Sequence, residues 1–478
     1  MTLPLWQWQQ TAIDLAKDVG NIGFFAEMGV GKTRAVIETA KQKHFADGLA
    51  KTLIFCPLAV VHQWREELLK YSDIPERDIG IFTGASRADD FMRFVVHDSQ
   101  FSRKRIAITN YDSTRIKRFV QMLHDWLPEV MILDESHRVK DASTQRAKTI
   151  TALSDKVSHK YILTGTPILN SPADIFSQYR ILDGGATFGK NFYVFRSQWF
   201  HDKNSAWGHQ HNHFPNYQPR PELYKEFNAK IYQKAIRVKK EDCLDLPDLV
   251  RQRVTVEMSD EQKRLYDEMK KDFITWVRHE SLEKPAAVVA NMALTKALRL
   301  QQIVSGIAKD DNGVVHRLKD VPRLKVLEDL LSDIAPAHKT IIWSIFRDNY
   351  VQIAEVCKKL KIGYVEFHGE VAARDKQKAV DSFKGDDGVR VFISNPASGS
   401  EGLNLFESSY SIFYNRSFSY MYDTQAEARN YRAGSERHAK VTRIDFVTPE
   451  TIDEATLEAI EKKENMAETI LDWASAIS

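Results

Sequence analysis

The sequence predicts an α/β protein built from two parallel β-sheets, each covered by helices, and three observations support this. Short apolar runs alternate with helical stretches in the first part of the chain, as at Ile22–Phe25, Thr52–Cys56 and Val130–Leu133. Such strands are typical of a parallel sheet buried on both faces. A similar alternation returns after residue 326. The length of 478 residues, 43% of them hydrophobic, exceeds one compact domain and suffices for several cores.

Composition excludes some broad classes of protein. Lys and Arg number 67 against 65 Asp and Glu, so a nucleic-acid surface would have to be a local patch. The three cysteines, Cys56, Cys243 and Cys357, lie far apart, which suits a reducing compartment without disulfides. The first residues resemble no signal peptide, and no apolar run has membrane length. We therefore expect a cytoplasmic protein with no membrane partner.

The first informative segment is Ala26–Thr33, AEMGVGKT, which directly follows the apolar strand Ile22–Phe25. It matches the phosphate-binding loop pattern except that Ala26 takes the place of the first glycine. A loop that wraps an anion with backbone N–H groups needs unusual dihedral angles, and Gly29 and Gly31 allow them. The segment therefore predicts a nucleotide phosphate site.

Within this loop, Lys32 is expected to reach the β- and γ-phosphates, and Thr33 is expected to hold Mg²⁺. The following helix, Arg34–Lys43, would direct its positive N-terminal end at the phosphates. The predicted cofactors are ATP and Mg²⁺. The residues of this segment assigned to the nucleotide are Met28, Gly29, Val30, Gly31, Lys32, Thr33 and Arg34.

Upstream, Leu5–Ala12 leads into a predicted helix that reaches Lys17. Gln9 precedes the phosphate loop, and its amide can read the adenine edge with one donor and one acceptor. The alternative is a polar residue on an amphipathic helix, and both interpretations stay open.

Two adjacent carboxylates end the strand in Val130–His137, VMILDESH. Ligands of a parallel sheet bind at the carboxyl ends of its strands, so Asp134 and Glu135 should lie beside the phosphate loop. Asp134 is expected to hold Mg²⁺ and Glu135 to orient and deprotonate the attacking water. A third strand end, in Tyr161–Asn170, carries Thr164 and Thr166, whose hydroxyls could bridge the nucleotide site to a neighbouring lobe.

Together these segments resemble the Swi/Snf family, the branch of superfamily-two helicase-like ATPases that moves along duplex DNA. The segments that carry the resemblance are Gln9, Ala26–Thr33, Ile54–Trp64, Ile108–Tyr111, Asp134–Lys140 and Leu163–Asn170. The resemblance implies two RecA-like lobes, each a parallel sheet covered by helices, with helical protrusions between them. It also implies a second lobe that lacks a phosphate loop of its own.

The second half repeats the alternation of strands and helices. Its expected strands are Thr340–Ser344, Gly363–Phe367, Val389–Ser394, Ser411–Tyr414 and Lys440–Val447. Ile341–Ser344 resembles motif IV of the family, and Ser394–Leu405 resembles motif V, where Gly399 and Gly402 would allow a close approach of the backbone. We assign Gly402 to the nucleotide site.

Gln425–Gly434, QAEARNYRAG, resembles motif VI. Arg429 and Arg432 are three residues apart, so on a helix they would share one face. The resemblance implies that both guanidiniums reach the γ-phosphate when the two lobes close, and that Gln425 contributes to the nucleotide site. The expected catalytic residues are thus Lys32, Glu135, Arg429 and Arg432.

The chain divides into five expected segments. They are lobe 1 (1–183), a helical protrusion with linker (184–240), a second helical protrusion (241–325), lobe 2 (326–450) and a C-terminal helix (451–478). Glu261–Arg278 and Ala286–Ser305 should be the helices of the second protrusion. His201, His209, His211 and His213 could bind a metal, but no acidic or cysteine partner stands beside them, so a protrusion loop is the preferred interpretation. The C-terminal helix could brace one lobe against the other.

DNA contacts are expected from the ends of two strands and from one basic cluster. The candidate residues are Thr109, Asn110, Arg115, Lys117, Arg118 and Ser394. A solvated face is the alternative for the cluster, and DNA contact there should be sequence-independent and sensitive to salt.

Three features depart from the family pattern. Ser136 stands where alanine is usual, Ser435 replaces a glutamine, and Tyr414–Tyr422 replaces an Asp and Trp-Asn-Pro pattern. They leave ATPase activity expected but affect lobe coupling or DNA contact.

The expected function is an ATP-dependent duplex-DNA translocase, and two alternatives stay open. One is a strand-separating helicase of the same superfamily. The other is an ATP-controlled, DNA-bound platform acting on a protein partner. We expect a monomer, and a compact motor of this kind suits a bacterial or viral setting.

Overall fold

The structure is a computed structural model that describes residues 4–45, 50–96, 104–168, 171–202, 217–279, 286–310, 314–399, 403–462, 466, 469–470 and 473. The chain forms two compact units. Unit 1 comprises Met1–Lys203 with Asn216–Asp245, and unit 2 comprises Asn204–Pro215 with Leu246–Ser478.

Unit 1 contains a parallel seven-stranded sheet in the order β3-β4-β2-β5-β6-β1-β9. Its strands are β1 (Ile22–Ala26), β2 (Ala50–Cys56), β3 (Ile79–Phe82), β4 (Lys104–Asn110), β5 (Val130–Asp134), β6 (His159–Leu163) and β9 (Ala235–Val238). All five strands expected in this half form, and the predicted α/β fold is confirmed. The expected strands are Ile22–Phe25, Thr52–Cys56, Arg105–Thr109, Val130–Leu133 and Tyr161–Leu163.

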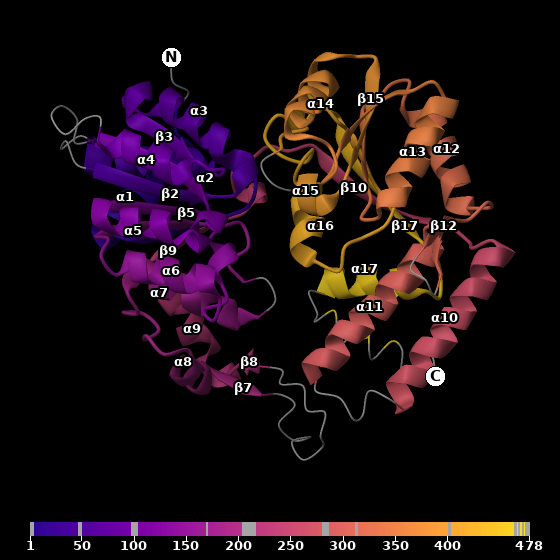
Figure 1. Ribbon diagram of the computed structural model, residues 1–478, viewed down its shortest axis with the longest axis horizontal. Helices are drawn as coiled ribbons and strands as arrows, with labels where there is room; N and C mark the ends of the chain where they lie inside the picture. The colour runs from indigo at the N-terminus through magenta and orange to yellow at the C-terminus, as the bar shows by residue number, and fades with distance from the viewer. Residues whose placement is uncertain are drawn as a thin grey trace. The chain divides into compact units, whose positions relative to one another are not determined.

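Helices cover both faces of this sheet (Figure 1). They are α1 (Gln7–Val19), α2 (Lys32–Ala40), α3 (Val61–Tyr71), α4 (Arg87–Val96), α5 (Lys117–Trp126), α6 (Gln145–Ser154), α7 (Ile175–Asp183), α8 (Phe192–Trp199) and α9 (Tyr224–Tyr232). Helices α1 to α3 pack on one face, and α4 to α7 pack on the other.

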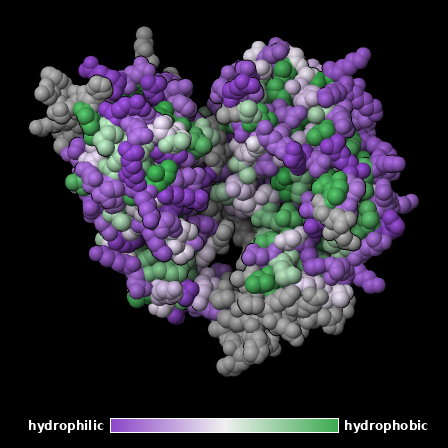
Figure 2. Space-filling model, viewed as in Figure 1, coloured by the Kyte–Doolittle hydropathy of each residue, from purple (hydrophilic) through white to green (hydrophobic). Residues whose placement is uncertain are grey.

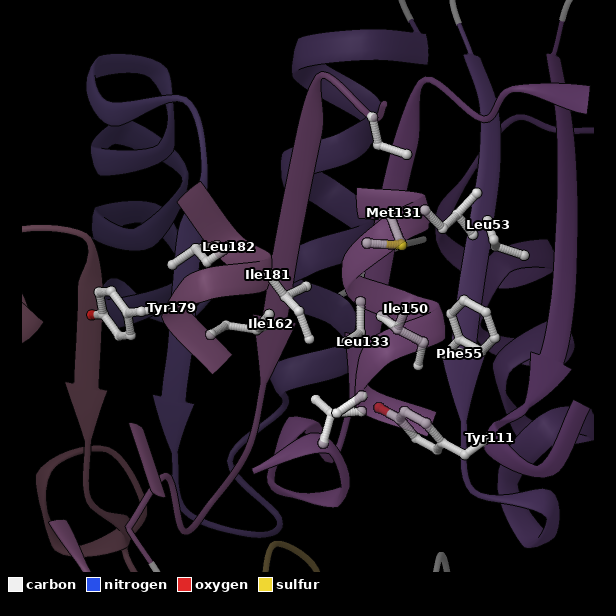
Figure 3. Packing of buried hydrophobic residues seen from close by; sticks show 14 of the residues in the cluster. Leu53, Phe55, Tyr111, Met131, Leu133, Ile150, Ile162, Tyr179, Ile181 and Leu182 are labelled. Atoms are coloured by element: carbon white, nitrogen blue, oxygen red, sulfur yellow. The ribbon is translucent and has the colours of Figure 1, made fainter. Parts of the chain in front are cut away.

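The central strand β5 shows why the sheet is apolar throughout. Val130 and Ile132 point into the core under α1 to α3, whereas Met131 and Leu133 point into the opposite core. Successive side chains of a strand alternate between faces, so a strand covered on both sides needs an unbroken apolar run. Figure 3 shows Met131 and Leu133 beside Ile150 of α6 in this second core.

Sequence reasoning missed β3 and β9. Strand β9 comes from the segment 184–240, which we expected to be a protrusion with a linker, and it pairs with β1. Both strands have only four residues, and a run that short carries little periodicity. The same segment also supplies α8, α9 and the antiparallel pair β7 (Phe200–Asp202) and β8 (Tyr217–Pro219).

Unit 2 contains a parallel six-stranded sheet in the order β10-β17-β16-β13-β15-β14. The strands are β10 (Asp248–Thr255), β13 (Thr340–Trp343), β14 (Gly363–Phe367), β15 (Val389–Ser394), β16 (Tyr410–Phe413) and β17 (Lys440–Val447). The five expected strands form within one residue of their expected bounds, and β10 at the edge was missed.

The helices of unit 2 form two groups. The α-helices described in this unit are α10 (Asp260–His279), α11 (Ala286–Val304), α12 (Pro322–Ile334), α13 (Arg347–Lys359), α14 (Ala373–Gly385), α15 (Pro396–Gly399), α16 (Tyr420–Glu427) and α17 (Ile452–Lys462). Helices α12 and α13 cover one face of the sheet, and α14 covers the other. Helices α10 and α11 pack with α17 in a separate core, where the Ile452 N–H donates to the Tyr266 hydroxyl at 2.9 Å. Strands β11 (Ile307–Lys309) and β12 (Val315–Arg317) form a hairpin after α11.

Hydrophilic residues cover much of the visible surface of unit 1 (Figure 2). Among the described residues, no helix combines the length and the apolar composition needed to cross a membrane.

One titratable group is built into the core of unit 1. His44 lies in the π-helical turn Lys41–Phe45 after α2, and its side chain is buried. Its Nε2 is 2.7 Å from the Tyr161 hydroxyl, and its ring centroid is 4.2 Å from that of His159. Burial, followed by the charges of His159 and Lys43, lowers the pKa of His44 to about 3.

We predict that unit 1 loses stability as the pH falls below the ordinary histidine pKa of about 6.5. A depressed pKa means that the folded chain binds fewer protons than the unfolded chain. The contribution is therefore complete above pH ~6.5 and is lost toward pH ~3, by at most about 1.4 kcal/mol per pH unit.

Denaturant unfolding at several pH values measures how the unfolding free energy changes with pH. Hydrogen exchange assigns the transition to unit 1. His44→Gln keeps a hydrogen-bonding group beside Tyr161 but does not titrate, so it should flatten the slope. The exposed His62 provides the control His62→Gln. Equal slopes in the wild type and His44→Gln would contradict the prediction.

Candidate functional site

The phosphate loop joins β1 to α2 and contains two left-handed glycines. Gly29 has φ 85° and Gly31 has φ 79°, conformations that favour glycine. The following helix begins at Lys32, two residues earlier than expected. Lys32 and Thr33 therefore lie in its first turn, where backbone N–H groups have no partner within the helix and can bind an anion.

The ammonium of Lys32 lies against the start of the loop. Its Nζ donates to the carbonyl oxygens of Ala26 at 2.8 Å and Glu27 at 3.0 Å. Thr33 is half-buried beside it on the first turn. The sequence-predicted cation and hydroxyl thus share one helical turn at the carboxyl end of β1.

Gln9 contacts the phosphate loop directly. Its side chain is buried, its Nε2 donates to the Gly31 carbonyl at 3.1 Å, and its Oε1 accepts from the Trp6 N–H at 2.9 Å. This arrangement differs from an exposed polar residue on an amphipathic helix. An amide retains a second hydrogen and a second lone pair, so these two bonds do not exhaust its capacity.

Other residues enclose the loop. A Cβ placed on Gly165 would lie 3.5 Å from Met28, so the segment after β6 approaches the loop closely. Arg34 donates to the Pro4 carbonyl at 3.1 Å, and its guanidinium lies 4.9 Å from the centre of the Tyr71 ring. Val30 is fully buried.

A cavity of about 670 Å³ adjoins the loop on the side of Trp6. Trp6 lines this cavity and also lies behind Gly31, with its Cζ3 3.4 Å from a Cβ built on that glycine. The remaining walls come from α1, from β9 and from the segment after β9. The lining residues are Trp6, Gln7, Trp8, Thr11, Ile236, Arg237, Val238, Glu241, Asp242, Cys243, Leu244 and Asp245.

Asp134 ends β5 and is half-buried. Its Oδ2 accepts a hydrogen bond from Trp64 Nε1 at 2.8 Å. Burial, and next the charge of Glu135, raise the pKa of Asp134 to about 6, against the opposing effects of Trp64 and Lys32. Strand β6 lies between β1 and β5, so the carboxyl ends of these strands meet at one edge of the sheet.

Glu135 and the residues after it connect β5 to the segment after β6. Glu135 has φ 54°, and its Oε2 is 3.2 Å from His137 Nδ1. The same ring nitrogen is 3.1 Å from the Thr164 hydroxyl. Ser136 Oγ donates to Gln178 Oε1 at 2.7 Å, inside the core.

This network corrects the expectation for Thr164. Its hydroxyl was expected to bridge to a neighbouring lobe, but the side chain is fully buried and bonded within unit 1. The amide of Gln178 also donates to the Pro167 carbonyl at 2.7 Å, so it links the two segments. Sequence reasoning missed Gln178, and Ser136 in place of alanine was the available signal.

Arg429 and Arg432 lie together in unit 2, but not on a helix. Helix α16 ends two residues before Arg429, and both arginines lie in the turn that follows. Arg429 Nε donates to the Gln425 carbonyl at 3.0 Å, which occupies the acceptor that a continuing helix would use. Both guanidiniums bond the Leu403 carbonyl, at 2.8 Å from Arg429 and 3.1 Å from Arg432. The expectation of a shared helical face was therefore wrong, although the two side chains converge.

Gln425 is buried within α16, close to this turn. Gly402, assigned to the nucleotide, lies outside the described residues, as do His209, His211 and His213. His201 lies in β7. Across the described part of the chain, no group of His, Cys, Asp and Glu side chains is arranged to hold a metal ion by itself.

A buried ion cluster holds α16 against the sheet of unit 2. Arg443 of β17 bonds Asp423 at 2.9 Å, Glu427 at 2.7 Å and Asp445 at 3.0 Å. Arg416 pairs with both Asp423 and Asp445. Buried charges are tolerated only when paired, and here every member has an opposite partner.

Glu427 also pairs with Arg251 of β10 at 2.8 Å. Burial acts to raise the pKa of Glu427, but hydrogen bonds and charges from Arg251 and Arg443 outweigh it and lower the pKa. The cluster therefore keeps Glu427 ionised two residues before Arg429.

Thr109 and Ser394, expected to contact DNA, are both fully buried. Thr109 Oγ1 donates to the Phe82 carbonyl at 2.7 Å, and Ser394 Oγ donates to the Phe367 carbonyl at 2.7 Å. Each hydroxyl thus fastens the last residue of an edge strand to the neighbouring strand, so neither side chain offers a surface to DNA. The expectation for these two side chains is corrected: they position the loops that follow.

The same pattern recurs in both sheets. Phe82 and Phe367 each begin a Phe-x-Gly segment, at 82–84 and 367–369, and an asparagine follows each buried hydroxyl. Cβ atoms placed on Gly84 and Gly369 would meet no atom within 4 Å, so both loops are open. The repeated Phe-x-Gly and Thr/Ser-Asn pairs are a sequence signal that our reasoning missed.

The asparagines that follow these hydroxyls, Asn110 and Asn395, accept hydrogen bonds from different kinds of donor. Asn110 is buried, and its Oδ1 accepts from Ser113 Oγ at 2.9 Å. Asn395 Oδ1 accepts from the Ala397 N–H at 2.8 Å. Both therefore order the turn that follows a strand end.

The basic cluster is on the surface of unit 1 near the start of α5. Arg115, Lys117 and Arg118 are all exposed, and Arg118 pairs with Asp89 at 2.8 Å. Their long side chains are available to a phosphate backbone.

Two family models match the chain. Residues 13–307 match the SNF2-related domain, and residues 322–434 match the helicase conserved C-terminal domain. The chain is 24% identical to the chromodomain-helicase-DNA-binding protein 1-like protein of Danio rerio over 93% of its own length and 41% of that protein. A second relative is a Caenorhabditis elegans protein, the homologue of SWI/SNF-related matrix-associated actin-dependent regulator of chromatin subfamily A-like protein 1. The chain is 25% identical to it over 93% of the chain and 58% of that protein.

The chain thus spans about half the length of these two relatives. A phage protein, p41 of Acyrthosiphon pisum secondary endosymbiont phage 1, is 23% identical, with 97% of each chain covered. Among solved structures, the SWI2/SNF2 ATPase core of Sulfolobus solfataricus in complex with dsDNA matches with a TM-score of 0.43. Its identity is 21%, over 99% of this chain and 94% of that one.

The glycines allow a matched test of the phosphate loop. Gly184 and Gly31 both have left-handed backbone, with φ 70° and ψ 13° against φ 79° and ψ 31°. A Cβ on Gly184 meets nothing, whereas one on Gly31 would lie 2.7 Å from Gln9 Nε2. Both alanine variants should lose about 1–2 kcal/mol from left-handed strain. Gly31→Ala should lose roughly 0.5–1.5 kcal/mol more, because Gln9 must move away from its carbonyl partner.

Denaturant unfolding of unit 1 and titration with a fluorescent ADP analogue measure both effects. Only Gly31→Ala should weaken nucleotide binding. Equal losses in the two variants would mean that Gln9 does not brace the loop.

A second matched pair tests the ion cluster of unit 2. Arg443→Met should lower the unfolding free energy of unit 2 by about 3–5 kcal/mol, because it leaves three carboxylates of the buried cluster with only Arg416 and Arg251 as cationic partners. Arg251→Met removes a 58% exposed side chain from the same Glu427. It should cost at most about 1 kcal/mol.

Hydrogen exchange of peptides from α16 and β17 reports these values. A small loss in Arg443→Met would show that the cluster adds little to stability.

Proposed function

From the premise that the chain belongs to the SNF2-related family, we propose that it is a DNA-stimulated ATPase that couples hydrolysis to movement along duplex DNA. The observation that carries the proposal is the meeting of Lys32, Thr33, Asp134 and Glu135 at one sheet edge in a family member. Carboxylates next to a phosphate loop suit phosphoryl transfer.

The donor set fits Mg²⁺ with ATP. Thr33 and Asp134 supply the hydroxyl and carboxylate oxygens that Mg²⁺ prefers, and Trp64 donates to Oδ2 of Asp134. When bound, the ion would neutralise charge on the phosphates. Gln9 contacts the loop, and Trp6 adjoins both the loop and the cavity, so we propose that the adenine base binds there.

The roles of the side chains follow from their chemistry. Lys32 would bind the β- and γ-phosphates once it exchanges its carbonyl partners for them. Glu135, held near His137, would accept a proton from the attacking water. Arg429 and Arg432 would supply positive charge to the γ-phosphate, a contribution of about 10³–10⁵ in rate for an arginine finger.

For DNA we propose sequence-independent contact with the phosphate backbone. The surface candidates are Arg115, Lys117 and Arg118, together with the open loops at Gly84 and Gly369. Asn110 would order the first of these surfaces rather than reach DNA itself. Such binding weakens as salt increases, because counterions are released.

Two further predictions stay with the proposal. The chain acts as a monomer, and it works in the cytoplasm of a bacterial or viral system. A strand-separating helicase and an ATP-controlled platform for a protein partner remain as alternatives.

The first experiment is steady-state ATP hydrolysis without nucleic acid, with single-stranded DNA, with duplex DNA and with duplex RNA. Duplex DNA should stimulate most strongly. Lys32→Ala should abolish turnover, and Arg432→Ala should lower it by about 10³-fold or more while nucleotide binding is largely retained.

Preference for single strands, with ATP-dependent strand release in a duplex-unwinding assay, would favour the helicase. Failure to displace the third strand of a triplex on naked DNA would favour the platform. Turnover that no nucleic acid stimulates would overturn the proposal.

A further inference from the structure

Two aromatic side chains, from the elements that follow β2 and β4, hold Asp134 by hydrogen bonds. Trp64 lies on α3, which follows β2, and only 1% of it is exposed. Its indole Nε1 donates to Asp134 Oδ2 at 2.8 Å. Tyr111 lies in the turn that follows β4, and its hydroxyl donates to the Asp134 main-chain carbonyl at 2.6 Å.

The two hydrogen bonds act on the same residue, Asp134, at the end of β5. Strand β2 lies next to β5, and β4 lies beyond β2. Trp64 packs in the core under α1 to α3 and Tyr111 in the opposite core, so the two donors reach the end of β5 from opposite faces of the sheet. One aromatic residue holds the carboxylate and the other holds the main chain of the same residue. A carboxylate fixed at one oxygen presents its other oxygen in a defined direction.

Tyr111 also connects this position to the surface. Its ring stacks on Phe55 with centroids 6.0 Å apart. Arg146 lies over the ring at 5.6 Å and pairs with the exposed Asp112 at 3.0 Å. The turn that holds Tyr111 also contains Arg115, a candidate DNA contact, while the N-terminal turn of α3 carries the exposed His62 and Gln63.

Packing alone does not explain the choice of partners. A buried indole N–H needs an acceptor, and a main-chain carbonyl would suffice. Here the acceptor of Trp64 is the carboxylate that we assign to Mg²⁺. Groups that hydrogen-bond a metal ligand set its orientation, and their loss commonly weakens metal binding by about 10–100-fold.

We propose that Trp64 and Tyr111 are positioning residues that couple DNA contact on unit 1 to the orientation of the metal-binding carboxylate Asp134. The inference rests on the proposed function, because it assumes that Asp134 binds Mg²⁺ and that the turn after β4 and the start of α3 meet DNA. DNA that orders the turn after β4 and the start of α3 would then steady both donors.

The test uses the full chain with conservative substitutions. Trp64→Phe and Tyr111→Phe keep an aromatic ring but remove the donor. Two matched controls come from the core of unit 1. Trp126→Phe changes another buried indole, and Tyr179→Phe removes a hydroxyl that donates to the Ile231 main-chain carbonyl.

The first readout is binding without turnover. Isothermal titration of ADP with Mg²⁺ and with EDTA gives the gain in affinity that the ion provides. Trp64→Phe should lower this gain by about 10-fold or more, with ADP binding in EDTA unchanged. The second readout is the ratio of ATP hydrolysis with and without duplex DNA, which Tyr111→Phe should lower more than it lowers the DNA-free rate.

The outcomes separate this inference from the proposed function. The inference is supported if Trp64→Phe lowers the affinity gain from Mg²⁺ and Tyr111→Phe lowers the stimulation by DNA, while both controls behave like the wild type. If all four variants change alike, the effect is structural and the inference is wrong. It is also wrong if a wild type that duplex DNA stimulates shows no change in either variant. A wild type without DNA stimulation would overturn the proposed function itself.

Discussion

The parallel pairing of β6 with both β1 and β5 is the interaction on which the site in unit 1 depends. It places the ends of three strands at one edge, so a loop, a carboxylate pair and a threonine turn meet although they are far apart in sequence. The left-handed glycines then bend the loop around the position of an anion, and α2 begins at Lys32 as a consequence. Some hydrogen bonds around this edge join residues that are far apart in sequence, as for Gln9 with Gly31 and Ser136 with Gln178.

The two units hold their functional residues by different means. In unit 1, neutral donors such as Gln178 and the Trp64 indole satisfy buried acceptors around the site. In unit 2, α16 is held by buried ions centred on Arg443. A buried ion cluster tolerates few alternative arrangements, since a displaced member would leave an unpaired charge in the interior. This gives the turn with Arg429 and Arg432 a fixed support.

The same hydrogen-bond pattern occurs at the edge of the sheet in each unit. In each unit, a hydroxyl near the end of the strand next to the edge donates to the last carbonyl of the edge strand. The hydroxyl belongs to Thr109 in unit 1 and to Ser394 in unit 2. The open glycine loops at Gly84 and Gly369 follow the edge strands that these bonds fasten. Both hydroxyls therefore serve the surfaces that meet DNA in our proposal, from inside the protein.

The family matches confirm the resemblance seen in motifs, and the sequence alone determined much of the fold. Apolar runs located ten strands because a strand buried on both faces needs side chains that are apolar throughout. The phosphate loop and the two carboxylates were readable because their chemistry is encoded in adjacent residues. Tertiary structure decided which groups remain available: it buried Thr109 and Thr164, bonded Gln9 to the loop, and ended α16 before Arg429. Each of these outcomes depends on a hydrogen-bond partner or a packing neighbour supplied by the folded chain, which residue patterns do not specify.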